Sequence, residues 1–204
     1  MAQVAARLPQ HSVINAGQNG NTILNLLARL EDVLAQEPEI IFVFCGGNDA
    51  ISYSQPETRR YYERVMKVPD GMVTPDQFRS HFRELLTRIQ LAQAVAYVGL
   101  SPMEANPTVA AAMQQYNQIV AEVCGSLNVP TLDLTQSLNP AHIPERPALT
   151  QATINLIGQR VKSGWKDYAV ERERGGYTYS FDGLHLTPEV AVQVADMVVE
   201  FLDL

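Results

Sequence analysis

The chain has 204 residues, a length that fits one domain with a full hydrophobic core. Hydrophobic residues make up 46% of the sequence and charged residues 18%, which is typical of a folded globular protein and excludes a disordered one. The net charge is -7 and the Lys and Arg residues are scattered, so we expect no nucleic-acid partner. No segment approaches the roughly 20 apolar residues of a membrane span.

The predicted elements alternate between strand and helix. Residues 1–8 read as a helix without a basic leader, so no signal peptide is visible. Residues 13–15 are a short predicted strand, which ends at a Gly-rich turn of residues 16–22. The spacing of apolar residues then predicts a helix over residues 23–34. Residues 40–45 are an unbroken apolar run, as in a strand buried on both faces of a parallel sheet.

The alternation continues to the C-terminus. After an irregular stretch through Asp70 and Gly71, Thr74 and Gln77 form a capping box that predicts a helix. The later elements follow in this order: a strand at 94–100, a helix opened by Asn106, a strand at 129–134 and a helix capped by Thr187. This order predicts an α/β fold with three α/β/α layers and a parallel sheet.

One segment, residues 139–179, does not fit the alternation. It contains several prolines, Trp165 and a helical pattern near residues 150–162. Long insertions of this kind tend to carry function, so we expect a lid or cap over the site within a single domain of residues 1–204. Cys45 and Cys124 lie in apolar segments and are expected to be buried free thiols. No cluster has metal-ligand spacing, and we expect neither a metal nor a cofactor.

The residues suited to catalysis lie in three short motifs. Asp182 precedes His185 by three residues, so its carboxylate can accept a hydrogen bond from Nδ1–H and leave Nε2 free as a base. Asn48, in the sequence Gly-Gly-Asn-Asp, and the backbone N–H of Gly20 can both donate to an oxyanion. Each motif alone is as readily a structural turn. A phosphate-binding turn at Gly17 and Gly20 is a weaker alternative, because the third glycine is missing.

In this order, the motifs resemble the blocks of the SGNH (GDSL-type) serine hydrolases. The turn around Gly20 resembles the second block, Gly46-Gly47-Asn48-Asp49 matches the third, and Asp182-Gly183-Leu184-His185 matches the last. The resemblance implies a flavodoxin-like sheet, Gly20 and Asn48 as oxyanion donors, His185 as base and Asp182 as its partner. It also implies a small-molecule ester substrate, such as an acyl ester, an acetylated sugar or a lipid.

The block that should carry the nucleophile is missing. No Gly-Asp-Ser occurs in the sequence, and Ser12 and Ser101 stand in unsuitable places. By resemblance the missing strand is central, and each buried backbone group left unpaired by its loss would cost about 1–3 kcal/mol. We therefore expect that the N-terminus is incomplete and that residues 1–204 alone are inactive. The sequence does not predict the localisation. The alternative is a catalytically inactive binding or regulatory domain of the same fold.

Overall fold

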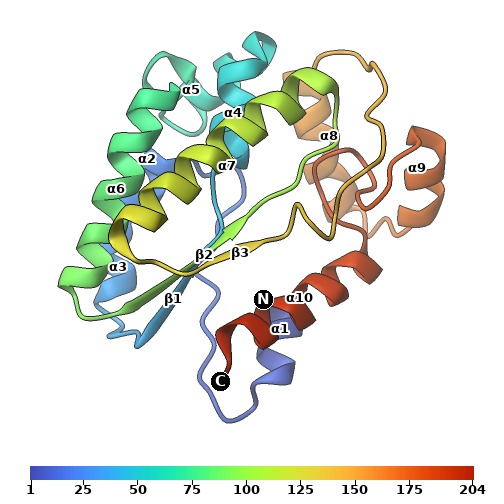
Figure 1. Cartoon of the computed structure of the whole chain (residues 1–204). Coiled ribbons are helices and arrows are strands. Elements are labelled where there is room, and N and C mark those ends of the chain that lie inside the picture. The colour runs from blue at the N-terminus through green and yellow to red at the C-terminus, as the bar shows by residue number, and fades with distance from the viewer. The chain divides into compact units, whose positions relative to one another are not determined.

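The computed structural model of the chain forms two compact units, and each is described by itself. The larger unit is Asn19–Lys166, and the smaller combines Met1–Gln18 with Asp167–Leu204 (Figure 1). The structure describes the backbone throughout and the side chains of residues 1–156, 159–160 and 162–204. Part of the helical pattern predicted at residues 150–162 thus lies outside the described side chains. The predicted insertion is divided, with residues 139–166 in the larger unit and 167–179 in the smaller.

The larger unit contains a parallel sheet of three strands. These are β1 (Ile40–Val43), β2 (Val95–Leu100) and β3 (Thr131–Asp133), in the spatial order β1-β2-β3. Ile41 pairs with Ala96, and Val98 pairs with both Val43 and Thr131. Helices connect the strands, as a parallel arrangement requires. The predicted α/β fold with a parallel sheet is confirmed.

The helices of this unit connect and cover the strands. In chain order they are α2 (Ile23–Ala28), α3 (Leu30–Leu34), α4 (Gly47–Ser54), α5 (Arg59–Arg64), α6 (Pro75–Leu91), α7 (Pro107–Leu127) and α8 (Gln151–Lys162), with 3-10 turns η1 (Pro56–Thr58) and η2 (Pro69–Gly71). The helix predicted over residues 23–34 is broken at Arg29 into α2 and α3. The stretch read as irregular before Gly71 is largely helical.

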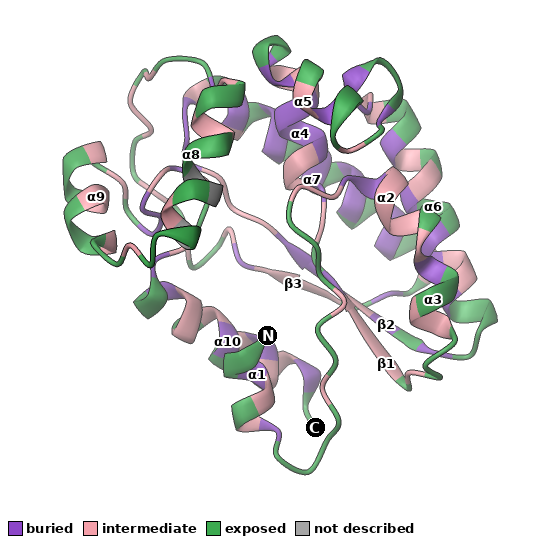
Figure 2. Ribbon diagram, turned by 180° about the vertical axis from the view of Figure 1, so that it is seen from behind, coloured by how far each residue is buried: buried purple, intermediate pink, exposed green. Residues whose placement is uncertain are grey.

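Aromatic packing between α6 and α7 forms the centre of the core. Phe78 stacks on Phe82 with ring centroids 5.5 Å apart, and meets Tyr116 edge-on at 4.9 Å. All three side chains are fully buried, and Figure 2 shows the buried faces of α4, α6 and α7. Burying each such side chain contributes about 1.5–3 kcal/mol. The predicted capping box of α6 is present, because Thr74 N–H donates to Gln77 Oε1 at 2.9 Å and Gln77 N–H donates to Thr74 Oγ1 at 3.3 Å.

The strand predicted at residues 13–15 is wrong. These residues have no regular secondary structure, although the structure describes all of them. A strand exists only when a neighbour accepts and donates its ladder hydrogen bonds. Within the described part of the chain, β1 pairs with β2 alone, so one of its edges is without a strand. The predicted strand at residues 40–45 is also shorter than expected and ends at Val43.

The smaller unit consists of three helices and a tight hairpin. The helices are α1 (Ala2–Arg7), α9 (Tyr168–Gly175) and α10 (Pro188–Leu202). Arg7 donates a hydrogen bond to Asp196 and so joins α1 to α10. Thr187 caps α10 as predicted, since its Oγ1 accepts from the N–H of Val190 at 3.4 Å.

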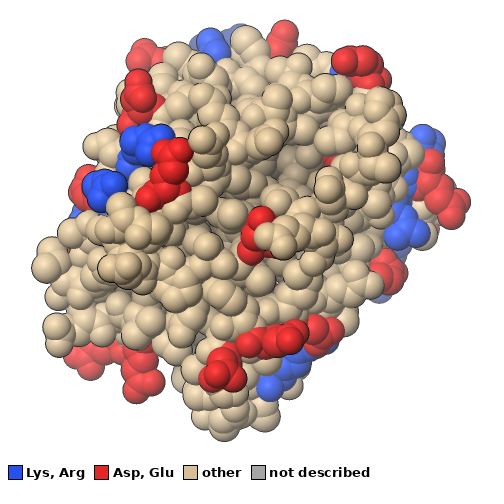
Figure 3. Space-filling model, viewed as in Figure 1, with Lys and Arg blue, Asp and Glu red and all other residues tan. Residues whose placement is uncertain are grey.

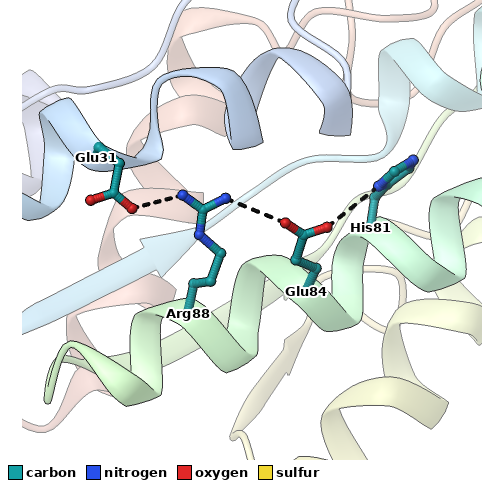
Figure 4. Close-up of polar contacts among 4 residues, drawn as sticks. All are labelled: Glu31, His81, Glu84 and Arg88. Carbon is teal, nitrogen blue, oxygen red and sulfur yellow. Dashed lines mark hydrogen bonds and ion pairs between the residues drawn. The ribbon is translucent and has the colours of Figure 1, made fainter.

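On the side of the molecule viewed in Figure 3, charged side chains form small groups, in several of which acidic and basic residues lie next to each other. One network joins α3 to α6, where Arg88 lies 2.7 Å from Glu31 and 3.3 Å from Glu84 (Figure 4). His81 Nδ1 approaches the other oxygen of Glu84 at 3.8 Å. No helix among the described residues has the length and apolar character needed to cross a membrane.

Candidate active site

Asp182 and His185 form a hydrogen-bonded pair in the smaller unit. His185 Nδ1 lies 2.9 Å from Asp182 Oδ2. The other carboxylate oxygen, Oδ1, accepts the backbone N–H groups of Leu184 at 3.0 Å and His185 at 2.8 Å. The Asp182 side chain is 11% exposed and the His185 side chain 50% exposed. The carboxylate is therefore fixed by three contacts, while the imidazole keeps an open edge.

A narrow hairpin holds this pair. Ser180 and Leu186 form an antiparallel bridge, and Phe181 N–H donates to His185 O at 3.0 Å. Gly183 turns the chain at φ +86°, a conformation that glycine adopts without strain. The ring of Phe181 stacks on the imidazole of His185 at 5.9 Å. The hairpin thus orients the imidazole ring of His185 in two ways, through stacking against Phe181 and through the contact with Asp182.

Gly20 lies in the larger unit, at the turn before α2. Its φ is +82°, and a Cβ there would come within 2.9 Å of Tyr61 Oη and 3.1 Å of Met66 Sδ. The backbone conformation therefore favours glycine, and any larger residue would also have to displace the ends of the Tyr61 and Met66 side chains. Within the described part of the chain, the N–H of Gly20 has no hydrogen-bond acceptor. This N–H is available to a ligand.

Asn48 lies in the first turn of α4 and contacts the Gly20 turn directly. Its Nδ2 donates to the carbonyl of Asn21 at 3.0 Å, which uses one of its two amide protons. Its Oδ1 accepts from the hydroxyl of Tyr62 at 2.8 Å. Gly46 is the N-cap residue of α4 and has φ +105°, a left-handed conformation. The second amide proton of Asn48 is left to donate beside Gly20.

Asp49 ties the same two segments together from inside the core. Its buried carboxylate accepts the N–H of Ile23, with Oδ1 at 3.0 Å and Oδ2 at 3.3 Å. Burial raises the pKa of Asp49 to about 7, against the lowering effect of the backbone hydrogen bonds from Ile23 and from its own N–H. The turn carrying Gly20 and the start of α4 are therefore one hydrogen-bonded assembly.

The structure thus brings the predicted residues together in pairs. Asp182 contacts His185 in one unit, and Asn48 contacts the turn of Gly20 in the other. Tyr62 was missed by sequence reasoning, because it lies in the stretch that was read as irregular. In the structure both Thr58, at the end of η1, and Tyr62, in α5, are buried.

Within the predicted insertion of residues 139–179, residues 144–149 form a strap that is anchored by hydrogen bonds to other parts of the larger unit. Arg146 Nη1 donates to the carbonyls of Glu104 at 2.8 Å and Ala105 at 3.2 Å. Leu149 N–H donates to Oε1 of the buried Gln55 at 2.8 Å. Gln55 caps the C-terminal end of α4 and Glu104 lies in the segment after β2, so the strap is tied to both of these places.

Three other side chains could be considered as nucleophiles, those of Ser101, Cys45 and Cys124. Ser101 Oγ donates to the carbonyl of Pro102 at 3.3 Å. Cys45 and Cys124 are free, and burial raises the pKa of both thiols, that of Cys124 to about 12. Both are thus held as neutral thiols. Among the described residues, no group of three or more His, Cys, Asp or Glu side chains could hold a metal ion.

The family profile of the GDSL-like lipase/acylhydrolases matches residues 1–191. The chain belongs to this family. Its members are ester hydrolases, and the parallel sheet and the three motifs agree with that membership. No curated protein matches the chain significantly.

Solved structures with a similar fold include two acetylxylan esterases. The esterase AlAXEase has a TM-score of 0.65 at 16% identity, covering 98% of this chain and 88% of its own. Axe2 from Geobacillus stearothermophilus has a TM-score of 0.63 at 19% identity, covering 100% of this chain and 78% of its own. At these identities the likeness shows the fold alone, and the fold is shared along the whole of this chain.

Proposed function

We propose that the chain supplies the oxyanion donors and the acid–base pair of a carboxylic ester hydrolase, with a serine nucleophile that residues 1–204 do not contain. The hydrogen bond of 2.9 Å between Asp182 and His185 carries this proposal. It presents Nδ1 to a carboxylate and leaves Nε2 unprotonated, the tautomer that a general base needs.

In the proposed reaction the serine hydroxyl attacks the ester carbonyl, and His185 Nε2 takes its proton. The C=O electrons move to oxygen, and the resulting oxyanion receives hydrogen bonds from Gly20 N–H and Asn48 Nδ2. Expulsion of the alcohol, protonated by His185, leaves an acyl-enzyme. A water then attacks the acyl group with His185 again as base, and the carboxylic acid departs. Each oxyanion donor is worth about 3–4 kcal/mol in comparable sites.

Acetylated sugars are the substrate class proposed first. Both structural relatives reported above are acetylxylan esterases. In Axe2, catalytic mutants replace a serine, an aspartate and a histidine, and the last two are three residues apart. Asp182 and His185 have the same spacing here. This supports their assignment as partner and base.

Hydrolysis of p-nitrophenyl acetate and of acetylated xylo-oligosaccharides tests the proposal. The chain of residues 1–204 should release no more product than its His185→Ala variant. If the reading frame upstream of Met1 encodes an apolar strand ending in Gly-Asp-Ser, the longer protein should hydrolyse both esters, and His185→Ala should abolish the activity. Activity of the longer protein that survives His185→Ala would contradict the proposal.

The second candidate is an inactive binding or regulatory domain, favoured by the lack of Gly-Asp-Ser within residues 1–204. A stop codon close upstream of Met1 would support it. Binding of an acetylated oligosaccharide without turnover, measured by calorimetry, would then be the expected property.

A further inference from the structure

The hydroxyl of Tyr62 is placed to control the side chain of Asn48. Tyr62 lies on α5 and is 1% exposed, and its oxygen is 2.8 Å from Asn48 Oδ1. A buried hydroxyl without a partner costs about 1–3 kcal/mol, so this contact is also required for Tyr62 itself. The contact joins α5 to α4, which are separated in the sequence by η1.

The neighbours of Asn48 permit only one orientation of its amide. The carbonyl of Asn21 can only accept a hydrogen bond, so it must face Nδ2, as it does at 3.0 Å. The opposite side of the amide then presents Oδ1 to Tyr62, which donates. A rotation by 180° would set two oxygens against each other at Asn21 and lose that hydrogen bond, while the Tyr62 hydroxyl would have to change from donor to acceptor.

Tyr62 is itself firmly held. Its ring meets that of Tyr61 edge-on at 5.3 Å, and its carbonyl accepts the N–H of Val68 at 3.0 Å. Arg59 donates from α5 to the carbonyl of Tyr53, at the end of α4, at 2.9 Å. Burial, followed by the charge of Asp49, raises the pKa of Tyr62 well above its ordinary value. The hydroxyl therefore keeps its proton near neutral pH and can donate.

We infer that Tyr62 is a positioning residue, which holds the Asn48 amide so that its second Nδ2 proton points to the ligand side of the Gly20 turn. This inference rests on the proposed function, in which Asn48 donates to an oxyanion. Without the hydroxyl, Asn48 keeps a single hydrogen bond at Asn21, and the amide is free to pivot about it. A donor that must be reoriented during the reaction stabilises an oxyanion less than one that is fixed beforehand.

The test is a comparison of Asn48 side-chain amide signals by ¹H–¹⁵N NMR in the chain of residues 1–204. In Tyr62→Phe, both Nδ2 proton signals should move, and their exchange with water should accelerate about fivefold or more, the factor expected for one neutral hydrogen bond. The matched control is Tyr116→Phe. Tyr116 is equally buried, and its hydroxyl donates to the carbonyl of Val73 and not to Asn48.

Unchanged Asn48 signals in Tyr62→Phe, or equal changes in Tyr116→Phe, would overturn the inference. If Tyr62→Phe does not fold, the inference can still be tested on the wild-type chain. The hydroxyl proton of Tyr62 should then be visible at low temperature, with a nuclear Overhauser effect to the Asn48 side chain, and its absence would count against the inference. These measurements need neither ester nor nucleophile, so their failure is distinguishable from failure of the hydrolysis assay.

Discussion

The carboxylate of Asp49 accepts a hydrogen bond from the backbone N–H of Ile23, the first residue of α2, at 3.0 Å. This contact crosses from the start of α4 to the end of the Gly20 turn. Burial raises the pKa of Asp49 to about 7. A titratable group near neutral pH therefore connects the two segments that carry the proposed oxyanion donors.

Asp49 should make the stability of the chain depend on pH in a defined window. In the unfolded chain the group titrates near pH 4, whereas in the folded chain it keeps its proton to about pH 7. The folded state thus binds more protons, and its stability falls as pH rises from about 4 to about 7, by up to about 1.4 kcal/mol per pH unit. Asp49→Asn preserves the shape and cannot ionise. Urea unfolding between pH 4 and 8 should show a flatter profile for this variant.

The matched control is Asp76→Asn. Asp76 is an exposed carboxylate in the first turn of α6. Its replacement should leave the slope parallel to that of the wild type. If the unfolding free energy of Asp49→Asn depended on pH as steeply as that of the wild type, the Asp49 carboxyl would not be the group that binds the proton on folding.

The residues that sequence reasoning placed well are those whose contacts are local. Asp182 and His185 are three residues apart, as are Thr74 and Gln77, so the motif itself contains the geometry. Tyr62 and Asn48 are 14 residues apart in the sequence, and the pattern of residues in either segment does not predict their contact. Such a contact exists only after α4 and α5 pack.

The wrong strand at residues 13–15 has a related cause. Two apolar residues, Val13 and Ile14, before a glycine turn are a local signal, but a strand depends on a neighbour that local patterns do not reveal. The run at residues 40–45 was recognised because it is longer and continuously apolar. Its end was misjudged by two residues, since Gly46 at φ +105° must turn the chain into α4.

Gly20→Ala should destabilise the protein by about 1–3 kcal/mol, because alanine is strained at φ +82°. The new Cβ would also come within 2.9 Å of Tyr61 Oη, so the end of that side chain would have to shift, and relief of the backbone strain would alter the turn next to Asn48. Chemical denaturation measures the first effect, and the Asn48 amide signals report the second.

Gly125→Ala is the control for this substitution. Gly125 lies within α7, and a Cβ there meets nothing within 4 Å. Alanine in a helix interior is favoured over glycine by about 0.5–1 kcal/mol, so this variant should be more stable than the wild type. A neutral Gly20→Ala beside a stabilised Gly125→Ala would refute the strained turn.

Arg146→Ala should loosen the strap of residues 144–149. The guanidinium donates to two carbonyls, those of Glu104 and Ala105, and each lost hydrogen bond from a charged donor is worth about 1.5–3 kcal/mol. Hydrogen exchange should accelerate at Leu149 N–H, which donates to Gln55. Arg64→Ala, at an exposed arginine of α5, should leave this exchange unchanged. Equal protection of Leu149 in Arg146→Ala would show that Arg146 is not needed to anchor the strap.

Asp182→Asn should invert the tautomer of His185 without unfolding the hairpin. The backbone N–H groups of Leu184 and His185 hold Oδ1, so the new amide NH₂ must take the place of Oδ2, 2.9 Å from Nδ1. An NH₂ group donates to Nδ1, which forces the proton onto Nε2 and removes the basic lone pair from the position that a nucleophile would use. Long-range ¹H–¹⁵N correlation spectra at alkaline pH distinguish the two tautomers, and exposed His142 provides an internal reference whose signals should not change. In a complete hydrolase the same inversion lowers kcat by about 10⁴. Retention of the Nδ1–H tautomer in Asp182→Asn would mean that Asp182 does not orient this base.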